Sequence, residues 1–111
     1  MSDHYVMNDD HSVRKADLME WALAFADTDK RRVARDQIGA AWVSTVFLGL
    51  DHSFGEGPPL LFETLISGGP CDQEMWRYST WAEAVEGHKS AVAFAASHAP
   101  DEPKPPQEET P

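Results

Sequence analysis

The chain has 111 residues, and its 9 Lys and Arg stand against 19 Asp and Glu, so the formal charge is −10 with neutral histidines. A chain of this length is expected to form one domain with one modest core. The single cysteine, Cys71, excludes an internal disulfide and a thiolate zinc site, and no apolar run is long enough for a membrane span, so we expect a protein of a reducing cytoplasm without a membrane partner.

The two ends of the chain are acidic and poor in residues that build a core. Residues 1–14 hold three aspartates, and we expect a flexible N-terminus there. Residues 98–111 hold five of the eight prolines and four acidic residues. Such a segment cannot recover its ordering entropy by burial, so we expect a disordered tail and a single folded domain over residues 15–97.

The first predicted helix runs over about residues 18–27. Asp17 and Glu20 have the spacing of a capping box, in which the first side chain accepts from the helix backbone. Apolar residues then recur at helical spacing, at Leu18, Trp21, Ala22 and Phe25. This pattern predicts a helix that packs one face on the rest of the domain.

Between the predicted helices the apolar period drops to two. Four runs rich in β-branched and aromatic residues predict strands at residues 31–38, 40–50, 60–67 and 74–79. The connections are short and contain glycine and proline. Because parallel neighbours need a crossover of a dozen or more residues, we expect an antiparallel meander.

A second capping box, Thr80 and Glu83, starts a helix over residues 81–97. Gly87 inside it indicates either close packing against a neighbour or a tolerated weakness, and His88 on the apolar stripe is expected to pack with one ring nitrogen satisfied. The element order α-β-β-β-β-α predicts an α+β fold, with both helices on one face of the sheet.

The predicted central strands carry apolar residues on both sides. A sheet with one solvent-exposed face should alternate between apolar and polar residues, and these strands do not. We therefore expect the face away from the helices to be covered by another segment or molecule. Either a partner protein, a second copy or the chain's own N-terminal segment could supply it. The partner-binding residues that we predict are Trp42, Val46, Phe62 and Trp76.

Part of the chain resembles a known group of proteins. The segments Arg31–Ala34, Val43–His52, Gly57–Thr64 and Arg77–Thr80, followed by Gly87 and His88, resemble short proteins encoded in bacteriophages and prophages, over about residues 31–89. The group has no assigned activity. The resemblance therefore implies expression in the cytoplasm of a bacterial host, and no particular chemistry.

One loop and the adjoining strand end hold the residues for a candidate metal site. Asp51, His52, Glu56 and Glu63 could bring three carboxylates and one imidazole together. The alternative is a solvated loop in which Asp51 caps a turn. Asp51, His52 and Ser53 are not expected to form a hydrolytic triad, because neighbours on an extended chain point to opposite sides. We predict no catalytic residues and no cofactor.

The only basic cluster, formed by Lys30, Arg31, Arg32 and Arg35, has two interpretations. It could contact nucleic acid, but the net charge opposes this and no aromatic residue is interleaved, so we expect no nucleic-acid partner. Charges that protect an exposed edge strand from pairing with another chain are the simpler interpretation.

Three functions are compatible with these patterns. The first is a non-enzymatic protein-binding module that engages and inhibits a host or defence protein, and the acidic surface supports it. The second is a small metal-dependent hydrolase at the loop that begins at Asp51. The third is a homodimeric structural or assembly protein, joined through the open face of the sheet.

Overall fold

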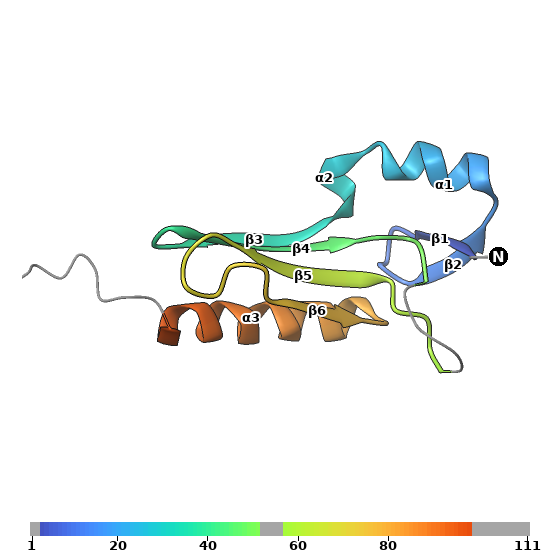
Figure 1. The fold of residues 1–111 in the computed structure, drawn as a ribbon. Coiled ribbons are helices and arrows are strands. Elements are labelled where there is room, and N and C mark those ends of the chain that lie inside the picture. The colour runs from blue at the N-terminus through green and yellow to red at the C-terminus, as the bar shows by residue number, and fades with distance from the viewer. Residues whose placement is uncertain (1–2, 52–56, 99–111) are drawn as a thin grey trace, which may run out of the picture.

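A computed structural model, which describes residues 3–51 and 57–98, has an α+β fold built around a four-stranded sheet (Figure 1). Its strands have the order β3-β4-β5-β6, and every neighbouring pair is antiparallel. The bounds are β3 Arg32–Ile38, β4 Ala41–Phe47, β5 Phe62–Ser67 and β6 Met75–Tyr78. The predicted antiparallel meander is therefore confirmed.

Helix α3, Trp81–His98, covers one face of this sheet (Figure 1). The capping box is formed: the Glu83 amide donates to Thr80 Oγ1 at 3.1 Å, and the Thr80 amide donates to Glu83 Oε1 at 3.2 Å. A Cβ at Gly87 would lie 2.2 Å from the Tyr78 ring, so close packing explains this glycine. In the described part of the chain, α3 and the other helices are all too short or too polar for a membrane span.

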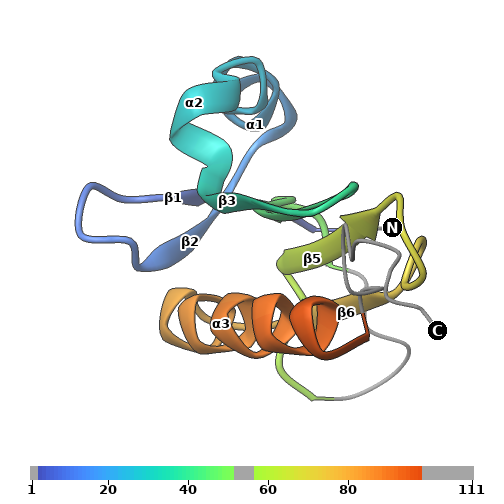
Figure 2. The same cartoon turned by 90° about the vertical axis from the view of Figure 1, so that its left-hand side faces the viewer.

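Helix α1, Leu18–Phe25, starts as predicted, with Asp17 accepting from the Glu20 amide at 2.8 Å. A second short helix, α2, Thr28–Arg31, follows it and was not predicted. The expectation that both long helices share one face of the sheet is wrong. Helix α1 packs on β1 and α2, on the side of the sheet away from α3, in both views (Figures 1 and 2).

The position of α1 follows from a hairpin that the sequence pattern did not reveal. Strands β1, His4–Met7, and β2, Val13–Ala16, pair antiparallel where a flexible N-terminus was expected. Contacts with residues distant in sequence hold this hairpin. The Tyr5 amide donates to the Gly49 carbonyl at 2.8 Å, and the His11 ring stacks on Trp81 with centroids 3.6 Å apart. The proposed tail after His98 lies outside the described residues.

The core between the sheet and α3 has two apolar clusters. One contains Ala41, Val43, Ile66, Cys71, Ala91 and Ala95, and the other contains Phe47, Leu61, Phe62 and Ala84. Three buried polar residues, Thr45, Thr64 and His88, also lie on this side of the sheet. Small alanines on α3 let the helix approach the sheet closely, which leaves large side chains to the strands.

Candidate functional site

The register of the sheet decides which predicted residues share a face. Val46 pairs with Glu63, and Phe47 pairs with Phe62. Phe62 therefore points with Phe47 toward α3, where it is fully buried. The expectation that Phe62 forms a docking surface with Trp42 and Val46 is wrong, because alternate residues of paired strands point to opposite faces and the register was not visible in the sequence.

Trp76 also lies on the α3 side of the sheet. It is half-buried, and its ring meets Phe94 edge to face with centroids 5.5 Å apart. Of the four residues predicted to bind a partner, only Trp42 and Val46 therefore lie on the opposite face, which we call the open face.

The open face is more polar than the sequence suggested. The residues that the register and the pleat place on it are Arg32, Arg35, Gln37, Trp42, Ser44, Val46, Glu63, Leu65, Ser67, Met75 and Arg77, and none of them is buried. The expectation of two apolar faces is wrong because the outer strands β3 and β6 contribute charged residues to this one. One solvent-exposed face of this kind is common in antiparallel sheets.

The three most exposed large apolar residues of the described chain lie on α1 instead. Leu18, Met19 and Leu23 are 62%, 69% and 70% exposed, and Phe25 is 37% exposed. No residue of this helix is buried. We call these four side chains the α1 surface. They distinguish α1 from α3, which buries one residue in nearly every turn.

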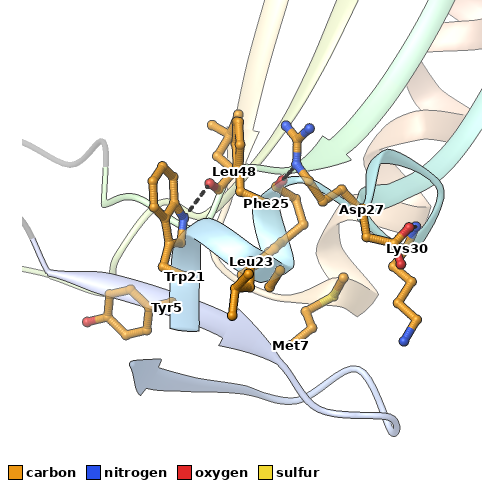
Figure 3. A pocket seen from close by; sticks show the side chains of 11 residues that line it. Tyr5, Met7, Trp21, Leu23, Phe25, Asp27, Lys30 and Leu48 are labelled. Atoms are coloured by element: carbon orange, nitrogen blue, oxygen red, sulfur yellow. Dashed lines mark hydrogen bonds between the residues drawn. The ribbon is translucent and has the colours of Figure 1, made fainter. Parts of the chain in front are cut away.

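A pocket of about 320 Å³ lies between α1 and the rest of the fold (Figure 3). Strand β1, helices α1 and α2 and the end of β4 line it, with mostly apolar side chains. Two of its lining residues, Leu23 and Phe25, also belong to the α1 surface. The pocket and the α1 surface are therefore continuous.

Two side chains tie the pocket walls to the main sheet. Trp21 Nε1 donates to the Leu48 carbonyl at 3.4 Å, and Arg31 Nε donates to the Phe47 carbonyl at 3.1 Å (Figure 3). The Arg31 guanidinium also lies over the Phe25 ring, 3.7 Å from its centroid. Burial lowers the pKa of Arg31 from its ordinary value, but a guanidinium remains protonated at any physiological pH.

A row of polar groups crosses the core under α3. His88 Nδ1 lies 2.7 Å from Thr45 Oγ1, and His88 Nε2 lies 2.7 Å from Asp36 Oδ2. The row continues from Thr45 to Thr64, which accepts from the Tyr78 hydroxyl at 3.1 Å. Both ring nitrogens of His88 are therefore satisfied, one more than the sequence predicted.

The row has the residue types of a hydrolytic triad without access to a substrate. Thr45 and Thr64 are fully buried, and His88 is 4% exposed. A nucleophile must reach the reacting carbon, and neither threonine hydroxyl can do so in this closed core. The row therefore joins the sheet to α3 as a structural element.

The predicted metal site is only partly described. His52 and Glu56 lie outside the described residues. Asp51 accepts from the Leu60 amide at 3.0 Å across the loop, and Glu63 accepts from Arg77 Nε at 3.2 Å. Among the described residues no cluster of three metal-binding side chains occurs. A site at this loop stays a prediction.

The basic cluster is divided between two places. Arg31 lines the pocket beside Lys30, whereas Arg32 and Arg35 lie on β3. Strand β3 is an outer strand of its sheet, as the edge-protection interpretation requires. Arg35 stacks on Trp42, with its guanidinium carbon 4.1 Å from the ring centroid.

Comparisons with known proteins add no relative. No protein-family model, no curated protein and no solved structure matches the chain. The resemblance to bacteriophage and prophage proteins therefore stays a prediction.

The α1 surface is the feature that the sequence reasoning missed. A signal for it was present, since seven of the eight residues at 18–25 are apolar and leave no polar face. An amphipathic helix on a single-chain core should keep such a face. The spacing of Leu18, Trp21, Ala22 and Phe25 predicts one packed stripe, whereas Met19, Leu23 and Ala24 are further apolar residues outside that stripe.

Proposed function

We propose that the protein is a non-enzymatic protein-binding module that self-associates through the α1 surface. The observation that carries this proposal is the exposure of α1, a helix with a single polar residue and no buried one. A helix that is apolar on all sides is normally found inside a protein or at an interface. Contiguous apolar side chains on the outside of a domain mark a site of association.

The charges around α1 favour a second copy of this chain as the molecule that covers it. Glu20 is the only ionisable side chain in the helix, and Arg14 of β2 pairs with it. Two α1 helices can therefore approach across a two-fold axis without an unpaired charge from within either helix at the contact, despite a net charge of −10. Homodimer interfaces are also more apolar than interfaces between different proteins.

The small residues of α1 support the same arrangement. Ala22 and Ala24 of the helix and its C-cap residue Ala26 are exposed beside the larger side chains. Alternating large and small side chains allow two helices to interdigitate at axial distances of about 8–10 Å. A paired α1 would also narrow the mouth of the pocket, because Leu23 and Phe25 belong to both.

We propose that the dimer is the form of the protein that binds its partner. It presents each remaining surface twice, which raises the avidity for a partner that carries two matching sites. On the resemblance to bacteriophage and prophage proteins, we place that partner in a bacterial host, with inhibition of a host or defence protein as the role.

Sedimentation velocity of the full chain at micromolar concentration tests the proposal. We expect a dimer for the wild type and a monomer for Leu23→Glu, because two charges would then be buried at the two-fold axis. The matched control is Met75→Glu on the open face, at a residue that is 44% exposed, and it should stay dimeric. A wild-type monomer, or dissociation by both variants, would remove the proposal.

A further inference from the structure

The charges of the sheet are sorted between its two faces. Asp36 points from β3 toward α3, where its carboxylate meets His88. The arginines of β3 and β6 point to the open face. Arg32 and Arg35 of β3 pair there with Val46 and Ser44, and Arg77 of β6 pairs with Glu63. In a chain of net charge −10, the open face thus carries three arginines against one carboxylate.

The single carboxylate of that face is already neutralised. Glu63 lies opposite Arg77 on the neighbouring strand, with 3.2 Å between Oε2 and Nη2. Arg32 lies 3.6 Å from Asp29 of α2, whose side chain is 88% exposed. Such exposed pairs are weak, so Arg32 remains available to another anion.

Arg35 has no carboxylate partner among the described residues. Its guanidinium lies over the ring of Trp42, which is itself 37% exposed. Stacking holds the planar group in one orientation and leaves its N–H donors free at the edge. A carboxylate can accept two parallel hydrogen bonds from a guanidinium presented in this way.

Apolar side chains surround these cations. Val46 and Leu65 are half-buried between the arginines, and Met75 is 44% exposed at the outer strand β6. Cations next to apolar contacts match a chain segment in which acidic residues are interspersed with apolar ones or prolines. Among the described residues of the open face Trp42 is the one exposed aromatic residue, which is too little for stacking a run of nucleic-acid bases.

We propose that the open face binds an acidic, extended segment of the partner protein, with Arg35 as its carboxylate-binding residue and Trp42 as its apolar anchor. This inference rests on the proposed function and names the chemistry of the partner. It concerns a surface other than the α1 surface. A dimer would display two open faces, and each would bind its own acidic segment.

The test uses fluorescence anisotropy of labelled peptides with the full chain near physiological ionic strength. The probe is a twelve-residue peptide of alternating Glu and Pro, and the reference peptide has Ser in place of Glu. We expect only the acidic peptide to bind. Arg35→Gln should weaken its binding about tenfold, because a charge-assisted bidentate contact is lost.

Lys89→Gln is the matched control, since Lys89 is exposed on α3 and pairs with Glu86 there. It should leave the affinity unchanged. The inference is overturned if the acidic peptide does not bind, if the Ser peptide binds equally, or if both variants weaken binding alike. Tighter binding of a thymidine oligonucleotide than of the acidic peptide would also overturn it and would indicate a nucleic-acid site.

The Leu23→Glu variant separates this inference from the proposed dimer. If the Leu23→Glu variant is monomeric and each chain binds the acidic peptide with wild-type affinity, the dimer through α1 and the binding site on the open face are both supported. If the wild type is monomeric and still binds the peptide through Arg35, the open face is a binding site and only the second copy at α1 is wrong.

Discussion

Trp21 Nε1 donates a hydrogen bond of 3.4 Å to the carbonyl oxygen of Leu48, and this bond connects α1 to the end of β4. The same ring lies beside Gly49, whose φ is +76° and whose Cβ, if present, would lie 2.5 Å from Trp21 Nε1. Trp21 therefore holds the inner side of the helix, while the side chains of Leu18, Met19 and Leu23 remain exposed.

Replacing Trp21 with Phe should weaken this connection while keeping an aromatic ring. We expect the free energy of unfolding to fall by about 1 kcal/mol, the usual net value of one hydrogen bond. Urea denaturation of Trp21→Phe and of Met19→Leu, an exposed position on the same helix, measures the difference. Equal stability of the two variants would show that the bond contributes nothing.

Gly87→Ala should destabilise the protein, although the same change in an exposed helix usually stabilises by about 1 kcal/mol. The new methyl group would meet the Tyr78 ring at 2.2 Å, and overpacking of this kind costs about 1–3 kcal/mol. In a Tyr78→Ala background the clash is absent, so Gly87→Ala should then stabilise. Thermal unfolding of the wild type, the two single variants and the double variant measures the effect of Gly87→Ala in each background. A stabilising effect of Gly87→Ala in the wild-type background would contradict the close packing of Gly87 against Tyr78.

Thr45→Val keeps the shape of a fully buried side chain and removes its hydroxyl. His88 Nδ1 then loses its partner, and an unsatisfied buried polar group costs about 1–3 kcal/mol. Ser44→Val on the open face is the control and should change stability by less. Guanidinium denaturation distinguishes them, and a Thr45→Val protein as stable as the control would argue against a structural role for the polar row.

The pair Arg14 and Glu20 gives a pH dependence with a definite sign. The hydrogen bond from Arg14 lowers the pKa of Glu20 below its ordinary value. A carboxylate with a lowered folded-state pKa stabilises the fold above its unfolded-state pKa, and this contribution is lost as the pH falls through the folded-state pKa. The stability difference between wild type and Glu20→Gln should therefore be largest at neutral pH and vanish in acid. Urea titrations over this range measure it, and a difference that grows in acid would contradict the pairing.

Local signals predicted most of the elements. The capping boxes at Asp17 and Thr80 marked the starts of α1 and α3, because they depend on residues only three positions apart. The four strands of the meander were also found, since β-branched runs and short glycine-containing connections are local too.

Features set by distant contacts could not be predicted in this way. The β1–β2 hairpin depends on the bond from Tyr5 to Gly49 and on the stacking of His11 with Trp81, across more than 40 residues in each case. The assignment of Phe62 to a face required the register with β4, which no pattern within one strand contains. For these two reasons the sequence predicted a docking surface on the sheet, whereas the three most exposed large apolar side chains of the described chain lie on α1.

The most direct test of the central claim is an isotope-filtered NOE experiment on a dimer mixed from labelled and unlabelled chains. If α1 is covered by a second copy, the methyl groups of Leu18, Met19 and Leu23 in the labelled chain should show NOEs to the unlabelled one. If such NOEs are absent at a concentration where the chain sediments as a dimer, or if they arise from Met75 and Trp42 instead, α1 is not the interface.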